Sequence, residues 1–501
     1  MSVIRLTAED GSPVEFDDAT MAGSGGMKDV YFSTDRSYVV AWFRKPQDAQ
    51  SLERLRNIVG PFREKIFNQP GGEYWKSLYC WPTKLVHESG YTGIVVPAYD
   101  RNFFFEFGSK NNDTLLGIKG KEKEGKWFAS ANHQQKHLDP QERGDWLKYL
   151  AICIKIARAC RRMHAAGLAH SDLSYKNVLV DPRTGNACLI DIDGLVVHGK
   201  FPPEVLGTPD FIAPEVMRTL KLPLTDPRRN LPRRETDQHA LAVLIYMYLL
   251  YRHPLRGGRV HDTSDPQRDE ELTMGEKALF VEHPADRTNR PNLREIKPSF
   301  LPYADVNKLP YTLTGPYLKA LFERAFMEGL HDPARRPTAD EWEHALVKTV
   351  DLIQPCPNPN CDQKWFVFES GSSVACPFCR TPLNRLTPVL AFFSSSDGRE
   401  EYRADQHRLV VYHNQYLYPW HVSRRIVPNE KLQADQRKPV AYFIFHQGKW
   451  LLVNQTLPGL KEMPSGKPVP PGSALELVNG GQILLSAEEG GRLLHVQLIQ
   501  T

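Results

Sequence analysis

An aspartate and an asparagine five positions apart, Asp172 and Asn177, constrain the fold of this chain more than any other feature. They follow residues 146–166, where apolar residues recur every three and four positions and the pattern stops at Gly167, as in an amphipathic helix. The apolar run 178–180 follows and predicts a buried strand. A carboxylate and an amide on such a loop suit phosphoryl transfer. The carboxylate can accept a hydroxyl proton, and the amide oxygen can bind a hard metal ion.

Two further motifs follow in a fixed order. A second strand-like run ends in Asp191-Ile192-Asp193-Gly194, and residues 207–215 read Gly-Thr-Pro-Asp-Phe-Ile-Ala-Pro-Glu. Together the three motifs resemble the catalytic loop, the D-F-G segment and the A-P-E end of the activation segment in eukaryotic-like (Hanks-type) protein kinases. The resemblance covers roughly residues 15–350 and implies an α+β, two-lobed protein-kinase-like fold.

The resemblance also implies roles for the matching residues. Asp172 would be the catalytic base, while Asn177 and Asp191 would bind the magnesium ion that accompanies ATP. Asp193 has two interpretations: a second carboxylate facing the metal, or a polar residue tolerated in a tight turn.

Matches further along the chain predict two structural contacts. Asp237 is expected to hold the backbone of the catalytic loop. Arg336, in the segment Asp-Pro-Ala-Arg-Arg-Pro-Thr, is expected to form a buried ion pair with Glu215.

The N-terminal half offers a glycine-rich loop and a hinge. Gly23, Gly25 and Gly26 precede a strand-like run, and glycines there let backbone N–H groups approach phosphates. Residues 95–99 resemble the hinge that holds adenine through backbone groups, which makes Ala98 a candidate contact.

The ATP-binding lysine does not occupy its usual slot, because Phe43 stands there. Lys45 lies two residues further along and would share a strand face with Phe43, so it is the first choice. Lys28, next to the glycine-rich loop, is the second. The expected carboxylate partner is Glu64, with Glu53 as the alternative.

Three departures from the kinase pattern bear on activity. Ser171 replaces the arginine of H-R-D, and no Ser or Thr lies between Gly194 and Gly207, so phosphorylation of the activation loop is not expected as a switch. Ser174 stands where the family has a lysine. The alternative to an active protein serine/threonine kinase is therefore a pseudokinase scaffold that binds nucleotide and recruits partners.

The eight cysteines fall into two groups. Four are scattered among apolar neighbours and predict buried thiols. The other four form a C-x₄-C…C-x₂-C pattern that is typical of a structural zinc site, with every coordination position filled by a thiolate: Cys356, Cys361, Cys376 and Cys379.

The C-terminal residues 387–501 predict a β-sandwich whose closing strands resemble a forkhead-associated domain. His421, Ser423 and Asn454 are candidates for that family's phosphothreonine site, but no convincing Gly-Arg or Asn-Gly stands at the expected places. Phosphopeptide binding and a plain scaffold both remain open. The full combination resembles bacterial kinases linked to TerY-type tellurium-resistance proteins, which implies a von Willebrand-type domain protein and a phosphatase as partners.

The predicted organisation is an N-lobe at 1–99, a C-lobe at 100–350 with an insertion at 100–145, a zinc ribbon at 351–386 and a sandwich at 387–501. The mixed-charge run 119–127 predicts a solvated loop, with a docking site as the alternative. A net charge of +4 gives no reason to expect nucleic-acid or membrane partners. No signal peptide is visible, so the expected compartment is a reducing cytoplasm.

Overall fold

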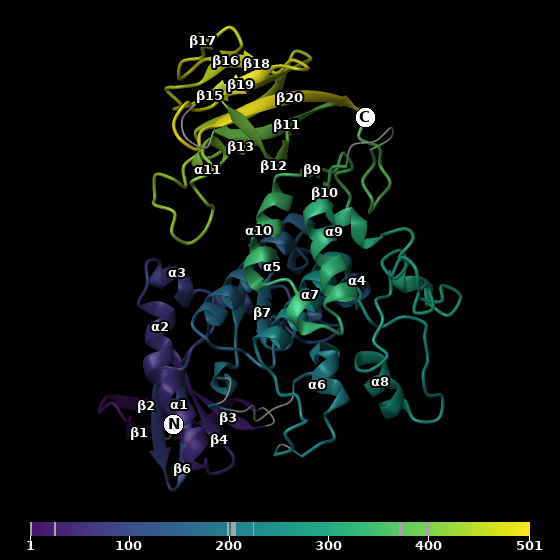
Figure 1. Cartoon of the computed structure of the whole chain (residues 1–501). Helices are drawn as coiled ribbons and strands as arrows, with labels where there is room; N and C mark the ends of the chain where they lie inside the picture. The colour runs from purple at the N-terminus through teal and green to yellow at the C-terminus, as the bar shows by residue number, and fades with distance from the viewer. Residues whose placement is uncertain are drawn as a thin grey trace. The chain divides into compact units, whose positions relative to one another are not determined.

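The computed structural model describes residues 3–24, 27–197, 200–201, 207–223, 225–369, 374–395 and 401–501. The chain divides into two compact units (Figure 1). The first comprises Met1–Gly144, Lys148–Tyr311 and Ala320–Glu343, and the second comprises Asp145–Leu147, Thr312–Lys319 and His344–Thr501.

The first unit begins with a six-stranded antiparallel sheet of order β1-β2-β3-β4-β6-β5. Successive residues of a strand point to opposite faces. Val40 accordingly packs in a cluster on one face, and Ala41 packs on the other with Leu55 of helix α1. The strands are β1 (Val3–Thr7), β2 (Pro13–Ser24), β3 (Lys28–Ser33), β4 (Tyr38–Phe43), β5 (Lys84–Glu88) and β6 (Tyr91–Pro97).

The helical segment after β4 is broken, as its Gly60-Pro61 pair predicts. α1 (Ala49–Asn57) starts at Asp48, whose carboxylate accepts a hydrogen bond from the Ser51 N–H at 2.7 Å. A π-helical turn, Ile58–Phe62, contains the non-helical Gly60 and leads into α2 (Arg63–Phe67). A further short helix, α3, covers Gly72–Lys76.

The regular secondary structure in the rest of the first unit is helical, apart from the hairpin of β7 (Val178–Asp181) and β8 (Asn186–Leu189). The predicted long helix is confirmed as α5 (Trp146–Ala165), and Gly167 behind it has a φ of +79°. The other helices here and at the boundary are α4 (Ala131–His137), α6 (Pro214–Arg218), α7 (Arg234–Leu250), α8 (Pro266–Met274), α9 (Pro316–Glu323) and α10 (Ala339–Val350). Short 3₁₀ or π turns cover Arg101–Phe103, Gly125–Trp127, Pro140–Glu142, Ile192–Gly194, Pro209–Phe211, Pro298–Phe300, Tyr311–Thr314, Arg324–Glu328 and Pro333–Arg335.

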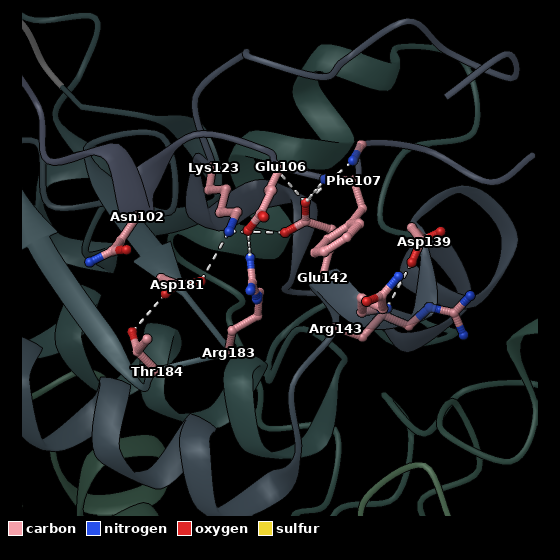
Figure 2. Close-up of polar contacts among 12 residues, drawn as sticks. Asn102, Glu106, Phe107, Lys123, Asp139, Glu142, Arg143, Asp181, Arg183 and Thr184 are labelled. Atoms are coloured by element: carbon pink, nitrogen blue, oxygen red, sulfur yellow. Dashed lines mark hydrogen bonds and ion pairs between the residues drawn. The ribbon is translucent and has the colours of Figure 1, made fainter. Parts of the chain in front are cut away.

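Lys123 of the mixed-charge run 119–127 differs from the solvated loop that these charges predict (Figure 2). Lys123 is 1% exposed, and its Nζ lies 2.9 Å from Glu142 Oε2 and 3.0 Å from Asp181 Oδ1. Glu142 Oε1 also accepts the backbone N–H groups of Glu106 and Phe107, at 2.7 Å each. The prediction is wrong at Lys123 because two buried carboxylates and backbone donors replace the water that this ammonium would otherwise need.

The insertion also extends the β7–β8 hairpin. The Val180 N–H donates to the Lys123 carbonyl at 3.0 Å, and the Lys126 N–H donates to the Tyr175 carbonyl at 3.1 Å. Tyr175 lies between Asp172 and Asn177 in the sequence. The buried cluster around Lys123 therefore fixes a segment that holds the loop of these two residues.

The second unit contains a short hairpin and two antiparallel sheets that share one apolar core. Leu390 and Phe392 from one sheet pack with Phe443 and Leu452 from the other. The hairpin is β9 (Ile353–Pro355) with β10 (Trp365–Val367). The six-stranded sheet has the order β12-β11-β20-β19-β16-β17 and the four-stranded sheet β13-β14-β15-β18.

The strand bounds in these two sheets are β11 (Leu386–Ser395), β12 (Tyr402–Val410), β13 (Tyr416–Leu417), β14 (Ala441–His446), β15 (Lys449–Asn454), β16 (Lys461–Met463), β17 (Lys467–Pro468), β18 (Ala474–Glu476), β19 (Gln482–Leu484) and β20 (Arg492–Gln500), and one short helix, α11, covers Pro419–Val422. Within the described residues, every helix is too short or too polar to cross a lipid bilayer.

Candidate active site

The loop between α5 and β7 brings Asp172 and Asn177 into direct contact. Asn177 Nδ2 donates to the Asp172 carbonyl at 2.8 Å and to Asp172 Oδ2 at 2.9 Å. Asp172 Oδ1 accepts the backbone N–H of Thr208 at 2.8 Å and its hydroxyl at 3.1 Å. Hydrogen bonds to both carboxylate oxygens orient Asp172.

Asp237 of α7 holds the backbone of this loop, as the sequence predicts. Its carboxylate accepts the N–H groups of His170, at 2.7 Å, and Ser171, at 3.1 Å. Ser171 has a φ of +70°, a conformation that a non-glycine residue keeps only when its surroundings fix it. His170 Nε2 in turn lies 2.9 Å from the Ile190 carbonyl, next to Asp191.

The predicted ion pair of Arg336 with Glu215 is also confirmed. Two parallel hydrogen bonds of 2.8 and 2.7 Å join the guanidinium to the carboxylate, and the two side chains are 1% and 7% exposed. A bidentate pair fixes both distance and orientation. It therefore anchors the end of the 207–215 motif to the segment before α10.

The lysine nearest the acidic residues is Lys28, not Lys45. Lys28 Nζ lies 2.8 Å from Asp191 Oδ1 and 2.7 Å from Asp193 Oδ1. The expectation that Lys45 continues the strand is wrong, because β4 ends at Phe43 and Lys45 is exposed beyond it. Lys28 instead pairs with Phe43 across the β3–β4 ladder, with Nζ 5.5 Å from the centre of the ring.

The structure does not bring the two expected glutamates to this lysine. Glu64 is exposed on α2, and Glu53 forms an exposed ion pair of 3.0 Å with Lys200. Helix α1 instead presents Arg54, which is 4% exposed. Burial lowers the pKa of Arg54, and the charges of Asp193 and Asp48 oppose this only in part. Sequence reasoning missed Arg54, because the search on this helix was for a carboxylate.

Burial and neighbouring charges shift the pKa values of Asp191 and Asp193 in opposite directions. Burial raises the pKa of Asp193, and the neighbouring Asp191 adds to this effect while Lys28 opposes it. Burial also acts to raise the pKa of Asp191, but Lys28 more than offsets it, so that pKa is lowered. Burial lowers the pKa of Lys28, and the two carboxylates outweigh it, so that pKa is raised. Asp191 and Lys28 are therefore charged at neutral pH.

These groups face a cavity of about 450 Å³. Asp172, Asp191, Asp193 and Lys28 line its polar end. Apolar side chains from β3, β4 and β6 line the remainder, among them Val30, Val39, Ala41, Ile94 and Val96. A site with apolar walls and a few converging polar groups is the usual form of a cofactor pocket.

The remaining predicted ATP contacts are placed as follows. Gly23 belongs to β2, opposite Val30, while Gly25 and Gly26 lie outside the described residues. Ala98 does not line this cavity, and its N–H donates to the Ser37 carbonyl at 3.0 Å. Its neighbour Tyr99 lines the cavity instead.

The structure brings the four clustered cysteines of the second unit together. Their sulfur atoms lie within 4.8 Å of one another, with Cys356 and Cys379 at 3.4 Å and Cys361 and Cys376 at 3.9 Å. Four thiols this close suit the donor set of a tetrahedral metal site. The other four cysteines are buried, as predicted.

Comparison with known proteins finds a family match for the middle of the chain. Residues 124–345 match the family described as protein kinase domain. The chain is 29% identical over 120 residues to the serine/threonine-protein kinase PkaB of Streptomyces coelicolor, a match that covers 22% of this chain and 26% of that protein. It is 28% identical over 146 residues to the serine/threonine-protein kinase PknD of Chlamydia felis, and this match covers 24% of this chain and 14% of that protein.

These matches thus span about a quarter or less of the curated relatives' own length. Among solved structures, a rhoptry antigen kinase domain of Toxoplasma gondii aligns with a TM-score of 0.39 and 14% identity, over 70% of this chain and 86% of that one. The family match and the contacts around Asp172 show that the chain contains a protein-kinase-like domain.

Proposed function

We propose that this protein is a serine/threonine kinase that transfers the γ-phosphoryl group of Mg-ATP to a Ser or Thr hydroxyl of a protein substrate. One observation carries the proposal: Asp172, bonded to Asn177, lines the same cavity as Asp191 and Lys28. Phosphoryl transfer needs a base, metal ligands and a cation near the phosphates, and this cavity has a residue for each.

The side chains suit distinct roles in that reaction. Asp172 accepts the proton of the substrate hydroxyl, and the hydrogen bonds from Asn177 and Thr208 keep its carboxylate in place. The amide oxygen of Asn177 and the ionised carboxylate of Asp191 are the hard ligands that Mg²⁺ prefers. The apolar walls of the cavity suit an adenine ring. Bound Mg-ATP supplies the phosphoryl group and the metal charge.

Lys28 is the residue that we assign to the phosphates in place of Lys45. It is the cation at the polar end of the cavity, and Asp193 and Asp191 hold it there. Asp193 anchors this lysine in the proposal, with Arg54 balancing the charge from α1.

For the second unit we propose a structural zinc ion bound by Cys356, Cys361, Cys376 and Cys379, supported by their mutual proximity. The two sheets with a shared core suit a β-sandwich that recruits partners. By resemblance, these partners belong to a tellurium-resistance type of system, with a von Willebrand-type domain protein and a phosphatase.

A pseudokinase scaffold that binds nucleotide is the second candidate. Ser174 favours it, because this residue replaces a lysine of the family, is fully buried and interacts with the Thr208 hydroxyl at 3.2 Å.

Incorporation of labelled phosphate from Mg-ATP tests the proposal on four full-length proteins. Relative to wild type, we expect the rate of phosphate incorporation to fall at least about 100-fold in Asp172→Ala and in Lys28→Met. A loss of this size is in the range that a general base or a key electrostatic group contributes. The matched control Lys45→Met should stay within about 3-fold, since Lys45 is exposed outside the cavity.

Thermal melts with and without Mg-ATP separate the two candidates. A melting point that rises with Mg-ATP, without incorporation by any of the proteins, supports the scaffold. No rise at saturating Mg-ATP contradicts both. A large loss in Lys45→Met but not in Lys28→Met overturns the lysine assignment alone.

A further inference from the structure

A second cavity of about 410 Å³ adjoins the candidate nucleotide cavity in the first unit. The two share only Cys80 and Tyr99 in their walls. The second cavity is bounded by α2, α3, the segments 77–83 and 97–103, α5 and β8. It contains none of Asp172, Asp191 or Lys28, so phosphoryl transfer does not account for it.

The charged residues that line this cavity are mainly cationic. They are Arg63, Lys76 and Lys155 against one carboxylate, Asp100. Lys76 is neutralised by Glu73 at 2.5 Å, and Asp100 Oδ1 accepts the backbone N–H of Asn102 at 2.9 Å. With Lys76 paired, Arg63 and Lys155 remain as two cations against the single carboxylate of Asp100.

One donor of the half-buried Arg63 side chain is unpaired within the described part of the chain. Its Nε is buried and has no hydrogen-bond partner among the described residues, while the guanidinium lies over the Phe67 ring at 5.6 Å. A buried donor without an acceptor lowers the stability of the fold, more so when it is charged. An anion in the cavity would remove this cost.

Lys155 is held in a cationic environment. Its Nζ donates to the Asn186 side-chain oxygen, a neutral acceptor. Burial, together with the charges of Arg158 and Lys148, lowers the pKa of Lys155 to about 8 against a weaker opposing effect of Asp181. Among the residues that the structure describes, this ammonium therefore has no ion-pair partner that would compensate its burial.

Flat apolar side chains form the other walls. The rings of Phe67, Tyr79 and Trp81 meet edge to face, with centroids 5.8–6.1 Å apart, and Phe103 also lines the space. Surfaces of this kind suit a planar apolar group.

We propose that this cavity is a second ligand site, which binds a small anion with a flat apolar body. Arg63 and Lys155 bind the anionic group, and the aromatic walls bind the body. The volume lies within the roughly 300–1,000 Å³ of small-molecule pockets. The proposal does not depend on kinase activity.

A matched pair of probes tests it by isothermal titration of the full chain: 2-naphthoate and its neutral analogue naphthalen-2-ylmethanol. We expect saturable binding of one naphthoate per chain, still present at saturating Mg-ATP, and at least about tenfold weaker binding of the alcohol. Arg63→Gln and Lys155→Gln should each weaken naphthoate at least about fivefold. Lys65→Gln should not, because Lys65 is exposed on α2 and does not line the cavity.

Several outcomes overturn the proposal. These are no naphthoate binding at millimolar concentration, equal affinity for the acid and the alcohol, displacement of naphthoate by Mg-ATP, or unchanged affinity in both variants. Near-UV circular dichroism checks that the variants fold. The probe comparison and the Mg-ATP competition use wild type, so they decide the matter even if a variant unfolds.

Discussion

The cation of the candidate active site comes from a different strand than the sequence pattern suggests, although from nearly the same point in space. Lys28 of β3 and Phe43 of β4 are directly paired, and paired residues on one face have Cβ atoms about 4.5–5.5 Å apart. A lysine at either of the two paired positions can therefore reach the same carboxylates. The sequence pattern places the replacement lysine further along the same strand, at Lys45. In the structure the replacement comes from the paired position on the neighbouring strand.

At the same scale, His253 should make the fold sensitive to acid. His253 Nδ1 accepts the Leu255 N–H at 3.1 Å, so its proton sits on Nε2 and is donated to the Asp210 carbonyl at 2.8 Å. A second proton would sit on Nδ1 and point at the Leu255 N–H, so the protonated ring could no longer accept that hydrogen bond. Burial lowers the pKa of His253 to about 4, and Asp210 opposes this only in part.

The folded-state pKa of His253 lies below the unfolded value of about 6.5, so the unfolded chain takes up the proton first as the pH falls. We expect this residue to remove about 3 kcal/mol of unfolding free energy between pH 7 and pH 4. Urea unfolding of wild type and His253→Gln at several pH values measures it. Parallel pH profiles for the two proteins would contradict the prediction.

Other single-residue contacts could be predicted from the sequence. The Glu215–Arg336 pair and the bonds from Asp237 to the catalytic loop were both found where the motifs place them. Their residues occupy fixed positions within motifs that fold in one way. Arg54 could not be predicted, because its role depends on Asp193, which approaches from a distant part of the chain.

At the scale of elements, α5 and the broken α1–α2 segment followed from apolar periodicity and from the Gly60-Pro61 pair. The structure of the insertion at 100–145 did not follow from such patterns. Its charge pattern describes local composition, while the partner of Lys123 at Asp181 lies 58 positions along the chain. Only the tertiary fold shows that this one lysine of a charged run is buried.

The buried cluster should support the insertion far more than its surface charges do. We expect Lys123→Met to lower the unfolding free energy by about 3–5 kcal/mol, because it leaves Glu142 and Asp181 buried without their cation. Arg183→Ala removes an ion pair with Glu106 whose side chains are 38% and 60% exposed, and should cost less than about 1 kcal/mol. Urea denaturation compares them, and equal losses would mean that the buried charges contribute no special stability.

At the scale of the whole molecule, the two units do not follow the chain in order. Residues 145–147 and 312–319 group with the second unit, although they lie within the predicted C-lobe. The sequence places motifs along a line, so it gives no reason to separate these short segments from their neighbours. The predicted domain boundaries remain predictions.

Metal removal should act on one unit only. We expect wild type to contain about one zinc ion per chain and Cys361→Ser to contain almost none, with a lower melting point for the transition of the second unit. The rise in melting point that Mg-ATP gives to the first unit should persist. Elemental analysis and calorimetry measure both. Full stability of metal-free protein, or loss of the Mg-ATP effect, would contradict the assignment.

The ion pair of Lys28 with Asp191 and Asp193 joins residues 163 and 165 positions apart, and all three line the candidate nucleotide cavity. For the proposed kinase it acts as an internal competitor, since an incoming metal ion seeks the same carboxylates that already hold an ammonium. The apparent nucleotide affinity is then the intrinsic affinity multiplied by the fraction of molecules in which this ion pair is broken. Nucleotide affinity in this chain is therefore adjustable through the strength of one salt bridge, without any change in the residues that touch adenine.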